Sequence, residues 1–231
     1  CGATNTFVRV VRSLIDPPIG GPRIVPATSL LAATRRPGLG EPWDRVLGKL
    51  PKLVRVLIHG MPGVGKTIMA LVLGEAIARS WGPTCYLALD EGAESPSFRE
   101  KLRTLEITRL EIALSCTLAG IIPLLEAREW AAVIIDTANR LGATPVELDD
   151  WSRRRNISWI VLTEATKGGE TYRGDSSWGH WSDLVVRVEW ESIEVLKNRY
   201  SETGVKPWGP RDLMESQRDS APAAGSSKES T

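Results

Sequence analysis

The feature that most constrains the fold is an apolar strand-like run that ends in a glycine-rich loop and leads into an apolar helix-like run. Residues 53–58 have strand character and residues 68–78 have helical character. Between them, GMPGVGKT (residues 60–67) matches the spacing G-x-x-x-x-G-K-[ST]. A strand joined to a helix in this way is the building unit of parallel α/β sheets. We therefore expect an α/β protein with a mostly parallel sheet.

The same loop has the residues of a phosphate-binding site. Glycines permit backbone dihedrals that a Cβ forbids, so successive N–H groups can turn toward an anion. A helix that begins near Lys66 adds the positive end of its dipole. Lys66 would reach the β- and γ-phosphates and the Thr67 hydroxyl would bind Mg²⁺, whereas the alternative is a strand-to-helix turn without a ligand. The predicted ATP contacts are Gly60, Met61, Pro62, Gly63, Val64, Gly65, Lys66, Thr67 and Ile68.

Apolar runs alternate with helical segments along the rest of the core. Residues 84–89, 131–135 and 157–162 are apolar without alternation, which indicates parallel strands covered on both faces. The last two runs, residues 184–190 and 193–197, leave no room for a helix between them. They predict an antiparallel hairpin at the edge of the sheet.

Composition divides the chain into three parts. Residues 1–40 are rich in glycine and proline and predict an extended N-terminal arm, residues 41–206 form the expected ATPase domain, and residues 207–231 predict a disordered polar tail. The net charge of +1 gives no general attraction to nucleic acid or membranes. Because no apolar run approaches bilayer length and no signal peptide is visible, we expect a soluble cytoplasmic protein without a membrane partner.

Acidic residues follow two of the apolar runs, where strands are expected to end. Asp136 follows residues 131–135 and predicts a second Mg²⁺ ligand, although an aspartate that caps the next helix is the alternative. Asp90 and Glu91 follow residues 84–89 at the same edge of the sheet. We expect Glu91 to be the catalytic base because its side chain reaches further. Asp90 is the second choice, and two solvated loop carboxylates are the remaining alternative.

Four segments resemble the bacterial RecA and RadA/Sms recombination ATPases. CYLALDEGAESPSFREKLRTL (residues 85–105) resembles the segment after their second core strand, where the glutamate at the position of Glu91 is catalytic. EPWDRVLGKLPKLVRVLIHGMPGVGKT (residues 41–67) is similar to the RadA/Sms lead-in, in which DRVLG precedes the P-loop. EATKGGE (residues 164–170) and VLKNRYSETGV (residues 195–205) resemble the VTKEG and KNRFG…EIGV elements.

The resemblance covers residues 1–206 and implies a RecA-type P-loop NTPase core. Such a core is a mostly parallel twisted sheet with helices on both faces, and it assembles as a homo-oligomer with nucleotide at the subunit interfaces. Residues 1–8 resemble the closing edge of the RadA/Sms zinc ribbon. A zinc ribbon needs four ligands and Cys1 has no CxxC partner within reach, so either the other cysteines lie upstream of residue 1 or residues 1–8 are a remnant of a lost ribbon. The resemblance ends at residue 206, and the polar residues 207–231 do not resemble the family's Lon-protease-like domain.

The DNA-facing loop of the family is altered. After Thr166 the chain reads KGGETYRGDSSWGHW, and the family's IAGPR is missing. Aromatic side chains and arginine on a glycine-rich loop suit stacking on the bases of single-stranded DNA. Packing of Trp178 and Trp181 over the sheet edge is the alternative. The predicted DNA contacts are Lys167, Tyr172, Arg173 and Trp178.

Two further groups of cations invite a phosphate-binding role. Residues 153–155 are three arginines, which more simply form a solvated helix end. Lys197 by itself would be assigned to a solvated sheet face. The resemblance implies instead that Lys197 crosses a subunit interface toward the γ-phosphate of a neighbour, where a cation stabilises transition-state charge. The predicted catalytic residues are therefore Lys66, Glu91 and Lys197.

These features predict a DNA-dependent ATPase of RadA/Sms type. It would use ATP and Mg²⁺ and act on single-stranded DNA in recombination or repair, as a branch-migration or strand-exchange accessory protein. A RecA-fold regulatory ATPase with a protein partner is the alternative, which the near-neutral charge and the altered loop favour. A small-molecule kinase ranks last, because no cluster of lid arginines is evident.

Overall fold

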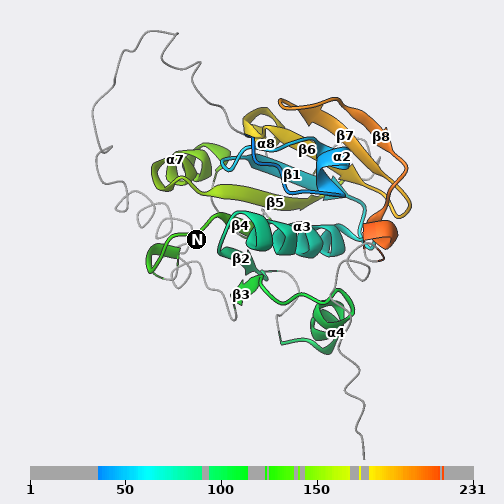
Figure 1. Cartoon of the computed structure of the whole chain (residues 1–231), viewed down its shortest axis with the longest axis horizontal. Coiled ribbons are helices and arrows are strands. Elements are labelled where there is room, and N and C mark those ends of the chain that lie inside the picture. Colours follow the sequence, from blue (N-terminus) through cyan, green and yellow to red (C-terminus); the bar gives the residue numbers. More distant parts are fainter. Residues whose placement is uncertain are drawn as a thin grey trace, which may run out of the picture.

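A computed structural model shows a single sheet flanked by helices (Figure 1). The structure describes residues 36–89, 94–113, 123, 125–137, 140, 144–166, 172, 177–213 and 215. Within them the sheet has eight strands in the order β3-β2-β4-β5-β1-β6-β7-β8. The strands are β1 (Arg55–Gly60), β2 (Thr84–Leu87), β3 (Glu111–Ala113), β4 (Ala132–Ile135), β5 (Ser158–Glu164), β6 (Leu184–Val188), β7 (Ile193–Asn198) and β8 (Gly204–Lys206). The helices are α2 (Trp43–Leu47), α3 (Lys66–Ser80), α4 (Pro96–Thr104), α7 (Pro145–Arg155) and α8 (Ser177–Trp181).

The strands from β3 to β6 are parallel, as their continuous apolar sequences predict. Successive side chains of a strand point to opposite faces, and in a sheet covered on both faces all of them are buried. The buried apolar side chains form two hydrophobic clusters. In β1, Val56 and Ile58 belong to the first cluster and Leu57 belongs to the second. The parallel order brings the carboxyl ends of β1, β2 and β4 to one edge of the sheet.

Helices cover both faces of the sheet, which confirms the predicted α/β architecture. Figure 1 shows α3 running along one face, and its buried residues, such as Met69 and Leu73, join the first cluster. On the other face, Leu148 of α7 and Trp178 of α8 join the second cluster. Within the described residues, no helix is long and apolar enough to span a bilayer.

A buried carboxylate on α3 holds the segment that precedes β3. Glu75 is fully buried and accepts hydrogen bonds from the backbone N–H groups of Thr108, Arg109 and Leu110, at 3.2, 2.9 and 2.9 Å. Burial alone would raise the pKa of Glu75, but these bonds and one from Arg79 outweigh it and lower the pKa. Glu75 thus fastens the segment before β3 to α3.

The carboxyl-terminal part of the sheet is larger than the predicted hairpin. β6 and β7 form that hairpin, with a register shift at Val185 and Val186, and β8 then adds a third antiparallel strand. The sequence gives little sign of β8, because its three residues, glycine, valine and lysine, have no apolar pattern.

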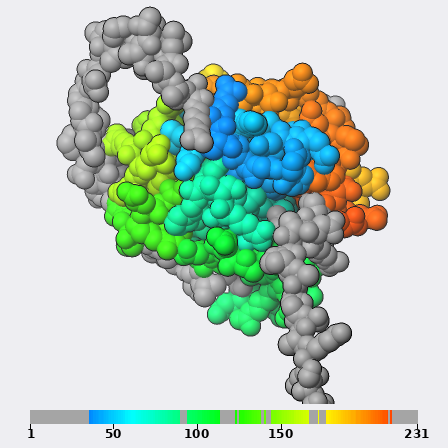
Figure 2. Space-filling model, viewed as in Figure 1, coloured from blue at the N-terminus to red at the C-terminus, as the bar shows by residue number. Residues whose placement is uncertain are grey.

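The described structure continues past residue 206, where the sequence predicts the start of a disordered tail, and includes residues 207–213 and 215. The rest of the predicted tail lies outside the described residues. Leu213 is fully buried in the first cluster, and Trp208 packs against it. The guanidinium of Arg45, on α2, lies 5.3 Å from the centre of the Trp208 ring. Figure 2 shows the blue segment that contains α2 on the surface between α3 and the orange C-terminal strands. Burial of Leu213 therefore holds a segment whose polar composition suggested disorder.

Candidate functional site

The glycine loop lies at the carboxyl end of β1 and turns the chain into α3. Gly63 and Gly65 have φ angles of +80° and +92°, which residues with a Cβ rarely adopt. Gly60 lies so close to the neighbouring strand that a Cβ would stand 2.5 Å from the carbonyl oxygen of Val188. The loop conformation therefore depends on the glycines of the motif.

Lys66 is the first residue of α3, and its side chain folds back over the loop. Its Nζ donates to the carbonyl oxygens of Gly60 and Met61, at 3.0 and 2.8 Å. Met61, Pro62 and Gly63 are exposed. An exposed loop, a cation held across it and the positive end of a 15-residue helix together suit the negative charge of phosphates.

A cavity of about 280 Å³ lies between the first turn of α3 and α4. Ile68, one of the predicted nucleotide contacts, forms its wall on the α3 side. The other lining residues are Ser97, Glu100, Lys101, Thr104 and Leu105. The volume is close to the lower end of the range typical of small-molecule sites.

Asp136 follows the last residue of β4 and is almost fully buried, with 6% of its surface exposed. Its Oδ2 accepts a hydrogen bond of 2.8 Å from the hydroxyl of Tyr86 on β2. The next residue, Thr137, has a φ angle of +74°, which is costly for a β-branched side chain. Thr67 lies in the first turn of α3, at the same edge of the sheet. A carboxylate and a hydroxyl at this edge are oxygen donors of the kind that Mg²⁺ prefers.

The predicted base and its rival, Glu91 and Asp90, lie outside the described residues. Leu89 is the last described residue before Asp90, and its carbonyl oxygen accepts a hydrogen bond of 2.8 Å from Nη1 of Arg140. The choice between the two carboxylates stays a prediction.

His59 is a residue of this edge that the sequence reasoning missed. It is the penultimate residue of β1, beside Gly60, and it is fully buried between Thr163 of β5 and Arg187 of β6. Neither ring nitrogen has a hydrogen-bond partner among the described residues. Burial, with smaller effects of Arg187 and Lys66, lowers the pKa of His59 to about 4. A polar residue inside an apolar strand next to the loop was the available signal.

The C-terminal segment is the second unexpected neighbour of the loop. Pro210 lies against Gly65, so that a Cβ on Gly65 would stand 2.7 Å from Cγ of the proline. Burial of Leu213 anchors this segment. In Figure 1 the short orange-red helical turn lies beside the end of α3, where the glycine loop is.

The predicted DNA contacts divide into three groups. Lys167 and Arg173 lie outside the described residues. Trp178 is 3% exposed and packs its ring edge-on against Trp159, so it takes the packing role given as the alternative, and we correct the prediction that it contacts DNA. Tyr172 is half-buried, with its ring 5.5 Å from that of His59, and its hydroxyl accepts a hydrogen bond from the N–H of Gly179.

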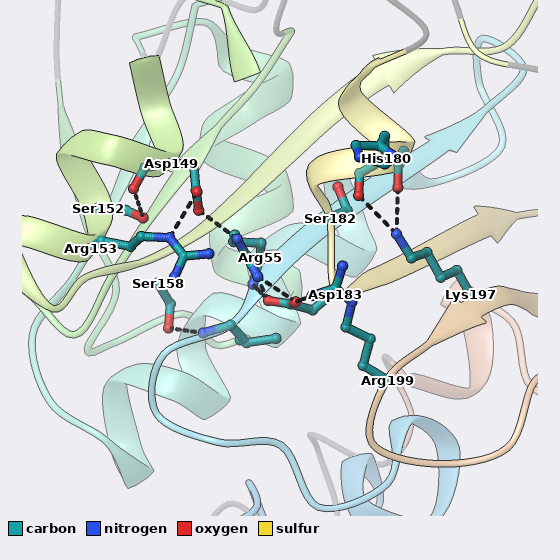
Figure 3. A network of polar contacts seen from close by, with 12 residues as sticks. Arg55, Asp149, Ser152, Arg153, Ser158, His180, Ser182, Asp183, Lys197 and Arg199 are labelled. Carbon is teal, nitrogen blue, oxygen red and sulfur yellow. Dashed lines mark hydrogen bonds and ion pairs between the residues drawn. The ribbon is translucent and has the colours of Figure 1, made fainter. Parts of the chain in front are cut away.

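Lys197 is remote from the glycine loop of its own chain. It pairs with Val185 of β6, which in turn pairs with Leu57 of β1. Lys197 therefore lies two strands away from β1, level with a residue three positions before Gly60. The two positions are separated by about 10 Å across the strands and by about 10 Å along them. Its Nζ donates to the carbonyl oxygens of Gly179 and His180 on α8, at 2.9 and 3.0 Å (Figure 3).

A buried ionic cluster lies at the amino ends of β1 and β6, beside Lys197 (Figure 3). The guanidinium of Arg55 bonds to both Asp183 and Asp149, at 2.7 and 2.6 Å. Arg199 approaches the same Asp183 carboxylate at 3.2 Å, and Arg153 bonds to Asp149. Arg153, at the end of α7, therefore has a carboxylate partner within its own chain.

Comparison with known proteins supports the fold. No protein-family model matches the sequence, and no curated protein does. Among solved structures, the chain is similar to a KaiC-like protein from the hyperthermophilic archaeon Pyrococcus horikoshii. The likeness has a TM-score of 0.59 at 17% sequence identity and covers 75% of this chain and 93% of that one. With the sheet described above, it confirms the predicted RecA-type core with antiparallel strands at its edge.

Proposed function

We propose that this protein binds ATP with Mg²⁺ at the glycine loop and hydrolyses it, as a RecA-type ATPase of the RadA/Sms kind. The observation that carries the proposal is the loop itself: glycines at positive φ, Lys66 across the loop and the start of α3 form an anion site. The triphosphate would lie on residues 60–67, and the nucleoside would extend into the cavity beside Ile68.

Thr67 and Asp136 would hold the magnesium ion. When bound, Mg²⁺ supplies positive charge that offsets the charge of the phosphates during transfer. Tyr86 keeps the Asp136 carboxylate in place through its hydroxyl. Glu91 would accept the proton of the attacking water, and Asp90 is the alternative base.

We assign Lys197 to the site of a neighbouring subunit. About 10 Å along the sheet and about 10 Å across it separate Lys197 from Gly60, which is more than a lysine side chain spans. A role at phosphate therefore requires a second copy of the chain, and a homo-oligomer with nucleotide at its interfaces meets this requirement. Lys197→Ala subunits mixed with Lys66→Ala subunits should then recover part of the turnover.

Single-stranded DNA is our first choice of partner, through Lys167, Tyr172 and Arg173 in a recombination or repair process. A protein partner is the second choice. It is favoured by the burial of Trp178, which leaves fewer aromatic rings for stacking, and by a net charge of only +1.

The deciding experiment is ATP turnover against the concentration of single-stranded DNA at two salt concentrations. Phosphate contacts make DNA binding fall steeply with salt, so stimulation should be strong at low salt and weak at high salt. Replacement of Tyr172 and Arg173 by alanine should remove the stimulation. Turnover that stays independent of DNA, in protein shown to be assembled, rejects DNA in favour of a protein partner.

A further inference from the structure

The carboxyl end of the short helix α8 contacts the side chain of Lys197. The Lys197 ammonium donates two hydrogen bonds there, to the carbonyl oxygens of Gly179 and His180 (Figure 3). The last carbonyls of a helix have no intrahelical partner, and they attract a cation. The lysine that we assign to a neighbour's phosphate is thus held within its own chain by α8.

Tyr172 contacts the same helix through Gly179. Its hydroxyl accepts a hydrogen bond of 2.9 Å from the N–H of Gly179. The fit is tight, because a Cβ on Gly179 would lie 2.3 Å from the tyrosine oxygen. The tyrosine ring also packs edge-on against His59, one residue before the glycine loop. Tyr172 therefore fixes Gly179, whose carbonyl oxygen holds Lys197.

The contacts of Lys197 suit reversible storage of its side chain. Burial lowers the pKa of its ammonium, and Arg199 lowers it further, whereas Asp183 opposes them. The bonded partners are neutral carbonyls and not a carboxylate. A triphosphate offers full negative charges, and charge-assisted hydrogen bonds are stronger than those to neutral acceptors. The ammonium would therefore leave α8 readily when a phosphate comes within reach.

We propose that α8 is a latch that stores Lys197, and that Tyr172 keeps the latch closed. The proposal rests on the proposed function, because release matters only if Lys197 acts on a neighbour's nucleotide. A ligand that draws Tyr172 away from Gly179 loosens α8 and frees the lysine. In this way, binding at Tyr172 raises ATP turnover in the adjacent subunit.

The test is chemical labelling of Lys197. The protein is treated briefly with an amine-acetylating N-hydroxysuccinimide ester without nucleotide, and acetylation of Lys197 is measured by peptide mass spectrometry relative to Lys206. Tyr172→Phe removes one hydrogen bond with little change in shape, so Lys197 should be labelled about two- to tenfold faster. Gly179→Ala should have a larger effect, because its methyl group displaces Tyr172 or α8.

Tyr86→Phe is the matched control, since it removes a tyrosine hydroxyl that donates to Asp136 and lies on β2, remote from Lys197 on β7. Its labelling of Lys197 should equal that of the unmodified protein. If Tyr172→Phe melts at the normal temperature and labels Lys197 at the normal rate, the latch is wrong. A separate measurement tests the underlying function: Lys197→Ala should turn over ATP slowly. Normal turnover in Lys197→Ala would reject the proposed role of the lysine, whatever the labelling shows.

Discussion

The buried histidine beside the glycine loop makes stability depend on pH. His59 is fully buried, and neither of its ring nitrogens has a hydrogen-bond partner among the described residues. Burial is the main cause that lowers its pKa from 6.5 to about 4, and Arg187 and Lys66 add to it. The unfolded chain therefore binds a proton at His59 more tightly than the folded protein does.

The direction and size of the effect follow from this difference. Acid favours the state that binds protons more tightly, so the contribution of neutral His59 is complete above pH 6.5 and declines toward about pH 4. One pKa unit corresponds to about 1.4 kcal/mol, so the full difference is roughly 3 kcal/mol. Between about pH 7.5 and about pH 4.5, linkage gives roughly 2–3 kcal/mol.

The assay is urea unfolding of the unmodified protein and of His59→Leu at these two pH values. Leucine fills the site with apolar atoms and cannot titrate. The unmodified protein should lose roughly 2–3 kcal/mol more unfolding free energy than the variant does. Other acidic groups contribute equally to both proteins, so their effect cancels in the comparison. Equal losses in the two proteins would refute the neutral buried imidazole.

Three further substitutions test the site and the core. Lys66→Ala should abolish ATP turnover and weaken binding of a fluorescent ATP analogue, because the loop loses its cation; near-normal turnover would refute the glycine loop as the ATP site. Glu91→Gln should bind the analogue but not hydrolyse ATP, whereas the same result in Asp90→Asn alone moves the base to Asp90. Glu75→Gln should lower the unfolding free energy by roughly 2–4 kcal/mol, since buried N–H groups lose a charged acceptor. This loss should be seen at neutral pH and shrink below about pH 4.5, where the low pKa of Glu75 in the folded protein is approached.

The parallel core could be predicted because its signals are local. A continuous apolar run, a glycine loop and a second apolar run specify β1 and α3 without reference to any other part of the chain. The predicted strand at residues 53–58 was still displaced by two residues from Arg55–Gly60, since apolar residues at the edge of a run do not define hydrogen bonding.

The features that the sequence did not predict depend on contacts between residues far apart in the sequence. Trp178 was expected on an exposed loop because its neighbours are glycine and serine, yet it packs against Trp159. Leu213 lies in a polar segment, and only its burial in the first hydrophobic cluster shows that the segment is part of the core. The average composition of a segment does not show that one of its residues is buried, so it cannot reveal such contacts.

A buried ionic cluster fixes the strand that carries Lys197. At the amino ends of β1 and β6, Arg55 joins Asp149 and Asp183, and removal of one partner from such a buried cluster costs about 3–5 kcal/mol. The cluster fixes the strand that carries Lys197, because Arg199 bonds to Asp183 through its backbone N–H as well as its side chain. The strand is therefore rigid, and only the lysine side chain and α8 need to move. A fixed strand would present the released ammonium at one defined point of a subunit interface, as a cation that completes a neighbour's site requires.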